Sequence, residues 1–335
     1  MKRHVTLTGI TPSGTPHLGN YLGAIRPAIQ KTRDNPNSDF YYFLADYHSL
    51  IKSNDFDKIK QSSIEVAASW LAAGLDPQRV QIYRQSDLIE TAELHWVLSC
   101  IAPKGLLNRA HAYKSVRDDN LANEREDDAG ISIGLFTYPV LMTADILLFD
   151  AHCVPVGADQ VQHVEIARDI ASAFNYRYGE TFVLPEADTS EGKLLTGLDG
   201  RKMSKSYHNA IQLYCPEKQL RKDIMKIKTN SQLPGEPKDP DESILFEYFQ
   251  AFGKEQEVLE VREMFIQGIG WGDAKEKLFQ LINREMKEER EKYDYYLAHP
   301  GLIEEILQAG AAKVRPAAKA KLADVRHKVG LRSFV

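Results

Sequence analysis

Short apolar runs alternate with longer amphipathic runs along the first two thirds of the chain. The short runs predict buried strands, because an uninterrupted apolar run between polar turns suits a strand covered on both faces. They occupy residues 4–10, 39–46, 80–85 and 152–156. The amphipathic runs predict helices over residues 18–31, 58–73, 92–100, 139–148 and 160–174. Strands that alternate with helices in this way are typical of an α/β domain with a parallel sheet.

The strand pattern ends near residue 210, and a helical pattern follows. Pro216 stands where a first helical turn would begin, and the apolar residues after it share one helical face: Leu220, Ile224 and Ile227. After the breaker-rich loop LPGEPKDPDES, helices are expected near residues 243–252, 255–267, 273–298, 301–311 and 317–328. A chain of 335 residues is long enough for two domains. We therefore expect an α/β domain over residues 1–210 and an all-helical domain over residues 211–335.

The segment VRDDNLANEREDDAG, residues 116–130, is nearly devoid of apolar side chains. Its carboxylates could suggest a metal site, because clustered acidic oxygens suit hard cations. A solvated, mobile loop explains the same composition more simply, and we favour that interpretation.

The overall composition is that of an ordinary globular protein, with 43% hydrophobic and 27% charged residues. It argues against a largely disordered chain, a collagen and a membrane bundle. The apolar run of residues 138–149 is broken by Asp145 and is too short to span a bilayer, so no membrane association is expected. Cys100, Cys153 and Cys215 form no CxxC pair, and we interpret them as structural thiols of a cytoplasmic protein.

The formal net charge of −5 means that nucleic-acid binding would need a local basic patch. The C-terminal segment supplies one, since residues 313–335 hold seven basic residues against Asp324 as their single acid. The seven are Lys313, Arg315, Lys319, Lys321, Arg326, Lys328 and Arg332. An ordinary solvated basic helix is the alternative interpretation of this patch.

The first chemical signal is TGITPSGTPHLGNYLGAI, residues 8–25, where a predicted strand enters a loop and then a helix. Gly14 and Gly19 allow the backbone to approach a ligand closely, and the helix start offers unpaired N–H groups to phosphates. His17, at that junction, could donate a hydrogen bond to a phosphate oxygen in a transition state. The alternative is a plain strand–turn–helix with a surface histidine.

The second signal is GRKMSKSYHN, residues 200–209, in a polar loop after the predicted strands. Lys202 and Lys205 flank Met203 and Ser204. Two lysines and neighbouring serines on such a loop suit a polyanion that must be clamped and released. A solvated basic loop is the simpler alternative for this segment taken alone.

The third signal is YPVLMTADILLF, residues 138–149, in which Pro139 suits the first turn of a helix. Tyr138, Met142 and Asp145 then fall on one helical face. An unpaired carboxylate at Asp145 would be costly among apolar side chains, so it must be paired, solvated in a cavity, or used in the chemistry. A buried ion pair is the alternative to a functional role.

Together, HLGN near the N-terminus and the later KMSKS resemble the signature pair of class I aminoacyl-tRNA synthetases. Methionine at position 142 is similar to the pattern of the tryptophan enzymes of this class, since the tyrosine enzymes typically carry glutamine at that position. VPVGADQVQH (154–163) and GIGWGDAKEKL (268–278) extend this similarity to bacterial tryptophanyl-tRNA synthetases over nearly the whole chain. The resemblance implies a Rossmann-like catalytic domain with a connective insertion near residues 88–150 and a signature loop at 200–206, followed by a helical domain that binds the tRNA anticodon.

The resemblance also implies a role for individual residues. Catalytic roles are expected for His17, Lys202, Ser204 and Lys205. ATP contacts are expected for Thr11, Pro12, Ser13, Gly19, Asn20, Gly157, Ala158, Asp159, Leu194, Lys202, Met203, Ser204 and Lys205. Tryptophan contacts are expected for Leu7, His48, Tyr138, Met142, Asp145 and Gln160. Thr11, Leu7 and Ala158 differ from the pattern of better-known bacterial members. Those members often have glutamine at position 11, an aromatic residue at position 7 and an acidic residue at position 158. A structural histidine after a strand is the alternative for His48.

The expected reaction joins L-tryptophan to ATP as tryptophanyl-adenylate and then transfers tryptophan to tRNA(Trp), releasing pyrophosphate and AMP. Mg²⁺ is expected on the ATP phosphates, held mainly by their oxygens and water, with no structural metal. The family also implies a homodimer. Rival interpretations are a tyrosyl-tRNA synthetase, disfavoured by Met142; a small-molecule adenylyltransferase, disfavoured by the helical domain and complete second motif; and an inactive binding paralogue.

Overall fold

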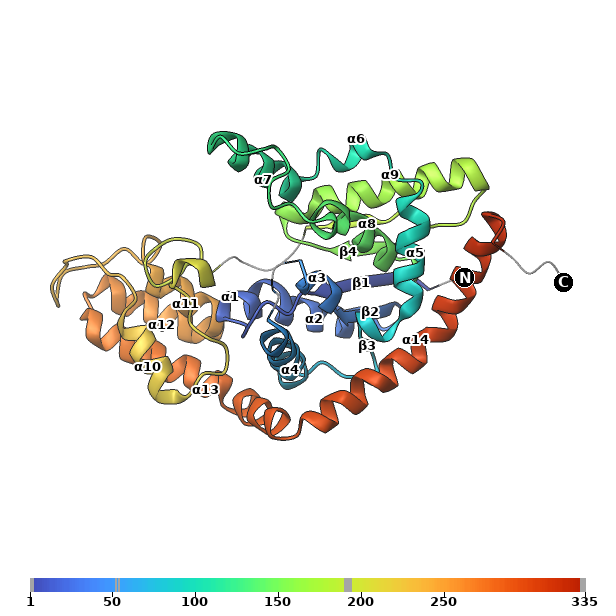
Figure 1. Cartoon of the computed structure of the whole chain (residues 1–335). Helices are drawn as coiled ribbons and strands as arrows, with labels where there is room; N and C mark the ends of the chain where they lie inside the picture. The colour runs from blue at the N-terminus through green and yellow to red at the C-terminus, as the bar shows by residue number, and fades with distance from the viewer. Residues whose placement is uncertain (1–2, 52, 54, 190–194, 332–335) are drawn as a thin grey trace.

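The computed structural model describes residues 3–51, 53, 55–189 and 195–331. Its centre is a parallel sheet of five strands in the order β3-β2-β1-β4-β5 (Figure 1). The strands are β1 (Val5–Ile10), β2 (Asp39–Leu44), β3 (Gln81–Arg84), β4 (Cys153–Pro155) and β5 (Glu186–Asp188). The strand order changes direction beside β1, which is where open parallel sheets bind ligands at the carboxyl ends of their strands.

Four of these strands lie where the apolar runs predict them. β5 was not predicted, because its three residues, Glu-Ala-Asp, carry no apolar run. Side chains alternate across the sheet as the pleat requires: Phe40, Tyr42 and Leu44 of β2 enter one apolar core, and Phe43 enters the other. The two faces of the sheet are therefore both buried.

Helices cover both faces of the sheet and form the rest of the molecule (Figure 1). Those of the sheet domain are α1 (Leu18–Asn20), the π-helical η1 (Tyr21–Ile25), α2 (Arg26–Asp34), α3 (Asp46–Ser49), α4 (Phe56–Ala72), η2 (Gln85–Asp87), α5 (Ile89–Ser99), α6 (Lys104–Leu107), α7 (His111–Ala122), α8 (Ile133–Leu147), η3 (Ala158–Gln160), α9 (Val161–Tyr178) and η4 (Lys205–Tyr207). The later ones are α10 (Glu217–Met225), α11 (Ile244–Phe252), α12 (Glu255–Ile266), α13 (Trp271–Ala298) and α14 (Pro300–Lys328).

The solvated loop predicted for residues 116–130 was wrong in its first half, because α7 extends to Ala122. Buried Asn120 holds the following turn, since its amide donates to the carbonyls of Asp127 and Ala129 at 3.0 and 2.9 Å. The low apolar content of this segment reflects an exposed helix. Among the described residues, no group of three or more His, Cys, Asp or Glu side chains is arranged to hold a metal ion.

Helix α8 begins six residues earlier than predicted, so Pro139 lies inside the helix and not in its first turn. Ser132 supplies the N-cap, its Oγ accepting from the backbone N–H of Leu135 at 3.1 Å. The sequence pattern missed this start because residues 132–137 precede the long apolar run. Tyr138, Met142 and Asp145 keep a common face, since all three lie within the continuous helix.

The two helices predicted at 301–311 and 317–328 are one helix, α14, with Pro316 inside it. In Figure 1, α14 leaves the helical end of the molecule and crosses beneath the sheet domain to its far side. Four buried apolar residues of its second half join the core formed by α5, α8 and α9: Val314, Ala318, Leu322 and Val325. Pro316 does not interrupt the helix, and the C-terminal half of α14 packs against the sheet domain.

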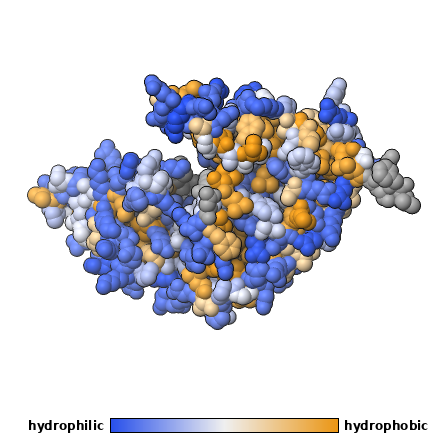
Figure 2. Space-filling view, viewed as in Figure 1, coloured by the Kyte–Doolittle hydropathy of each residue, from blue (hydrophilic) through white to orange (hydrophobic). Residues whose placement is uncertain are grey.

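On the face drawn in Figure 2, apolar residues gather over the middle and around α5 and α8, while the helical end is mostly hydrophilic. In the described part of the chain, no helix is long and apolar enough to cross a membrane.

Gly310 sets how closely α14 approaches the sheet. A Cβ at this position would lie 1.7 Å from the carbonyl oxygen of Ile82 in β3. We expect Gly310→Ala to push α14 off the strand and lower the free energy of unfolding by about 1–3 kcal/mol, the usual cost of overpacking. Gly301→Ala in the same helix is the matched control, because its added methyl group would meet no other segment of the chain within 4 Å. Denaturant unfolding of both variants tests this: equal midpoints would show that α14 does not dock through Gly310.

Candidate active site

His17 and Asn20 cap the helix that follows the first signature motif. The backbone N–H of Asn20 donates to Nδ1 of His17 at 3.2 Å, and the backbone N–H of His17 donates to Oδ1 of Asn20 at 3.0 Å. Burial, reinforced by the nearby Lys205 charge, lowers the pKa of His17 to about 4, so the imidazole is neutral near pH 7. Because Nδ1 accepts, the ring proton is on Nε2, which makes His17 a neutral hydrogen-bond donor.

The second signature loop contacts the first directly. The backbone N–H of Gly19 points at the Sδ of buried Met203, 3.3 Å away, and the Lys205 ammonium donates to the carbonyl of Ser13 at 3.2 Å. A Cβ on Gly19 would lie 3.0 Å from the His17 ring and 3.4 Å from Sδ of Met203, so a larger residue here would crowd both side chains. Gly19 and Met203, which are 184 positions apart in the sequence, thus lie in contact.

Asn209 holds the second loop in shape. Its Oδ1 accepts from the backbone N–H of Ser204 at 2.8 Å, and its amide donates to Asp199 and to the carbonyl of Lys202 at 2.7 and 3.1 Å. Ser204 also shares a hydrogen bond with Ser206. The Lys202 and Lys205 side chains remain exposed beside this braced loop. Sequence reasoning did not single out Asn209, because a lone asparagine in a polar loop carries no periodic signal.

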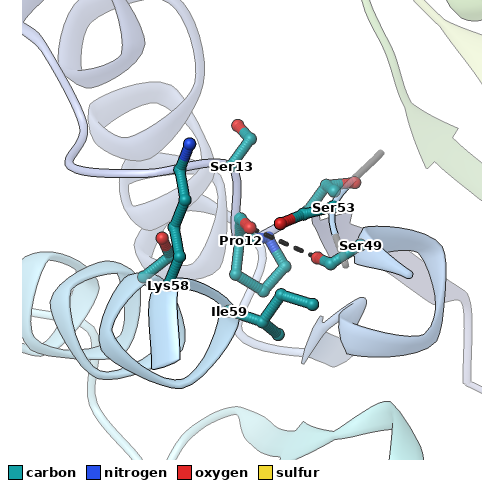
Figure 3. A pocket seen from close by; sticks show the side chains of 8 residues that line it. Pro12, Ser13, Ser49, Ser53, Lys58 and Ile59 are labelled. Carbon is teal, nitrogen blue, oxygen red and sulfur yellow. Dashed lines mark hydrogen bonds between the residues drawn. The ribbon is translucent and has the colours of Figure 1, made fainter. Parts of the chain in front are cut away.

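Thr11, Pro12 and Ser13 line a small cavity of about 120 Å³ between the first loop and α3 and α4. Figure 3 shows Lys58 of α4 extending alongside Ser13, and Ser49 bonded to Pro12. That bond, from Ser49 Oγ to the Pro12 carbonyl at 3.2 Å, fixes the loop against α3. Since His48 precedes Ser49 in α3, one short helix connects the loop with the buried Asp145 side chain.

Asp145 is buried and paired. The Gln85 amide donates to both of its carboxylate oxygens at 2.9 Å, and Nε2 of His48 lies 3.1 Å from Oδ2. Oε1 of Gln85 accepts from the backbone N–H of Tyr47 at 3.1 Å, which fixes the orientation of the amide. Burial raises the pKa of Asp145, and the bonds from His48 and Gln85 oppose that rise. Oδ1 receives one of these bonds and keeps the capacity to accept another.

Gln85 was missed in the sequence. Its position directly after a predicted strand was the available signal, because the carboxyl ends of parallel strands meet at one edge of a sheet. The expected site segments also follow strands there: the loop of residues 11–16 follows β1, α3 follows β2, and Gly157–Gln160 follows β4.

Tyr138 and Gln160 are joined through His163, another residue that the sequence analysis did not select. The Tyr138 hydroxyl lies 2.6 Å from Nε2 of His163, and Nδ1 of the same ring lies 2.9 Å from Oε1 of Gln160. The ring of Tyr138 meets that of His48 edge-on at 6.2 Å, so this network adjoins Asp145. The side chains of Tyr138, His48 and Gln160 are half-buried.

The remaining expected site residues lie around this region. Leu7 is 2% exposed and packs within the core, whereas Met142 is half-buried beside it. Ala158 and Asp159 are exposed on η3, just after Gly157. Leu194 lies outside the described residues.

Comparison with known proteins agrees with this geometry. The family model "tRNA synthetases class I (W and Y)" matches residues 2–287. The tryptophan–tRNA ligase of Neisseria meningitidis is 54% identical over 334 residues, which is 99% of both chains. That of Pseudomonas aeruginosa is 55% identical over 332 residues, which is 98% of this chain and 74% of the relative.

Among solved structures, the tryptophanyl-tRNA synthetase of Campylobacter jejuni, complexed with ADP and tryptophan, is 44% identical, with a TM-score of 0.89 over 97% of this chain and 99% of that one. One conclusion follows from the strand order of the parallel sheet and the contact between the two signature loops, together with 54–55% identity to tryptophan–tRNA ligases over nearly the whole chain. The chain belongs to the class I tRNA synthetases for tryptophan and tyrosine, in their tryptophanyl branch.

Proposed function

We propose that this site activates L-tryptophan with ATP and passes it to tRNA(Trp). A carboxylate oxygen of tryptophan attacks the α-phosphorus, the bond to the β-phosphate breaks, and pyrophosphate leaves. A hydroxyl at the 3′ end of the tRNA then attacks the carbonyl carbon of the adenylate, and AMP leaves. The observation that carries the proposal is the buried Asp145 carboxylate beside Met142 and Tyr138, on the same sheet edge as the His17 motif.

Asp145 is suited to recognise indole, whose single N–H is a donor inside a large apolar ring. Gln85 and His48 leave Oδ1 of Asp145 able to accept that N–H. Met142, half-buried on the same helix face, presents polarizable sulfur to the ring. Leu7 and His48 complete the proposed tryptophan pocket, and Tyr138 and Gln160 hold the α-amino group.

The phosphate chemistry needs positioning and electrostatic stabilisation and no protein nucleophile. Nε2 of His17 donates to a phosphate oxygen, and Lys202, Ser204 and Lys205 bind the leaving pyrophosphate. ATP enters as its Mg²⁺ complex, with the metal held mainly by phosphate oxygens and water. The proposed ATP contacts are Thr11, Pro12, Ser13, Gly19, Asn20, Gly157, Ala158, Asp159, Leu194 and Met203.

We place the tRNA anticodon on the helical domain of residues 211–335. Several basic side chains in the C-terminal half of α14 are already bonded within the protein, so fewer can bind tRNA phosphates than the composition suggests. Lys321 pairs with Asp150 at 2.7 Å, and Arg326 pairs with Glu93 at 2.5 Å. Three more of its basic side chains donate to backbone carbonyls of the catalytic domain: Lys313, Arg315 and Lys328. Part of this positive charge therefore fastens α14, and exposed Lys319 is better placed to meet a phosphate backbone.

A homodimer and a cytoplasmic location complete the proposal. Ile89 and Trp96 are 73% and 69% exposed and lie seven residues apart on α5, hence on one face of that helix. Such large apolar side chains suit the surface of a second copy. Sedimentation that finds only monomers at micromolar concentration would contradict the dimer.

The free thiols of Cys100, Cys153 and Cys215 fit a reducing compartment.

Asp145→Ala should weaken tryptophan recognition through the indole N–H. We expect kcat/KM for tryptophan to fall by the equivalent of about 2–4 kcal/mol, the cost of leaving a desolvated donor without its charged partner. The benzothiophene analogue of tryptophan, which has sulfur in place of N–H, serves as the control substrate. The preference for tryptophan over this analogue should collapse in the variant. If both substrates lose the same factor, Asp145 is structural and the assignment is wrong.

Lys205→Ala tests the mechanism. Charge on the leaving pyrophosphate grows toward the transition state, so an ammonium bound there should act mainly on kcat. We expect kcat for adenylate formation to fall by about 10²–10³, the scale of losing one transition-state donor, with little change in the tryptophan KM. Arg201→Ala, in the same loop and paired with Asp199 at 2.6 Å, is the control and should retain activity. A Lys205 variant with unchanged kcat and only a raised ATP KM would show instead that Lys205 binds ATP equally well in the ground state and in the transition state.

A further inference from the structure

A chain of four side chains crosses from α8 to the loop after β4. The Tyr138 hydroxyl meets Nε2 of His163 at 2.6 Å, Nδ1 of His163 meets Oε1 of Gln160 at 2.9 Å, and the Gln160 amide donates to Oδ2 of Asp159 at 2.9 Å. His163 is 2% exposed, so its ring nitrogens depend on these partners. Its neighbours in the chain include both residues proposed to hold the α-amino group of tryptophan.

The Asp159 carboxylate at one end of this series of side chains fixes which group donates and which accepts in every hydrogen bond of the series. The Asp159 carboxylate only accepts, so the nitrogen of the Gln160 amide faces it and the carbonyl oxygen faces His163. That oxygen also only accepts, so Nδ1 of His163 carries the proton. Burial lowers the pKa of His163 to about 4, which keeps the ring neutral and leaves Nε2 without a proton. Tyr138 must therefore donate its hydroxyl proton to His163.

This arrangement limits what Tyr138 can offer to a substrate. Its one O–H proton is committed to His163, so its oxygen can offer only lone pairs to a ligand. The carbonyl oxygen of Gln160 likewise has one lone pair left after accepting from Nδ1. Two acceptors fixed in this way match an ammonium group, which has three donors and no acceptor. A tyrosine with a rotating hydroxyl would instead present its proton to that cation part of the time.

We propose that His163 is a positioning residue that sets Tyr138 and Gln160 as acceptors for the α-ammonium group of the amino-acid substrate. This inference rests on the proposed function, since it concerns the same pocket. His163 is 2% exposed and acts through Tyr138 and Gln160, the two side chains proposed to contact the substrate.

A merely structural histidine would make a different prediction, and a ligand without the ammonium group separates the two. Indole-3-propionate has the indole and carboxylate of tryptophan but no amino group. In the full-length protein, His163→Asn removes the acceptor at the Nε2 position. We expect its affinity for tryptophan to fall about 10- to 100-fold, the range for losing a hydrogen bond to a charged group. Its affinity for indole-3-propionate should stay within about twofold, measured by titration calorimetry.

Two further variants sharpen the test. His163→Gln places an amide oxygen near the position of Nε2 and should recover most of the tryptophan affinity. His152→Asn is the matched control, because His152 accepts from the backbone N–H of Val5 at the start of β1, away from the carboxyl edge, and should change neither affinity. Equal losses for tryptophan and indole-3-propionate in His163→Asn, or no loss for either, would overturn the inference.

A measurement on the unmodified chain keeps the inference testable if the variants do not fold. Nitrogen-15 chemical shifts distinguish a ring protonated at Nδ1 from one protonated at Nε2. The inference requires His163 to be neutral with its proton on Nδ1 near pH 7, and the opposite tautomer or a charged ring would overturn it. Failure of the unmodified protein to bind tryptophan would instead contradict the proposed function, so the two failures are distinguishable.

Discussion

The buried carboxylate of Asp145 is the constraint around which the substrate side of the site is organised. A charge in an apolar helix must be paired or hydrogen-bonded, because its desolvation would otherwise cost several kcal/mol. Its partners come from two other segments: His48 from α3 after β2, and Gln85 from η2 after β3. The hydrogen bonds to this one side chain therefore fix α8 against the carboxyl ends of two strands, and Oδ1 keeps the capacity to accept one more hydrogen bond.

A second set of contacts joins the surroundings of Asp145 to the parts of the molecule that we propose bind phosphate and tRNA. Ser49, next to His48, holds Pro12 of the first signature loop, and Lys205 of the second loop holds Ser13. Behind the first motif, Glu289 of α13 accepts from the hydroxyls of Tyr21 and Tyr214 at 3.1 and 2.6 Å. The helical domain is thus hydrogen-bonded to Tyr21, which directly follows Asn20. A shift of that domain would therefore act directly on the end of the signature helix.

The sequence predicted the features that have a strong local signal. Four strands, the helical domain and the contact face of Tyr138, Met142 and Asp145 follow from apolar periodicity, and the two signature loops follow from motif resemblance. β5 was missed because three residues pairing with β4 need no apolar run. Gln85 and His163 were missed because their roles depend on partners 60 and 25 positions away. The unbroken α14 depends on its packing against β3 and α5, which local propensity at Pro316 does not contain.

The central claim is that a buried acceptor in an apolar pocket selects tryptophan for activation by ATP. Pyrophosphate exchange into ATP, measured with each of the twenty amino acids in turn, tests it most directly. The account predicts rapid exchange with tryptophan and only feeble exchange with tyrosine. Exchange that favours tyrosine, or that is absent with every amino acid while the protein is folded and binds ATP, would contradict it.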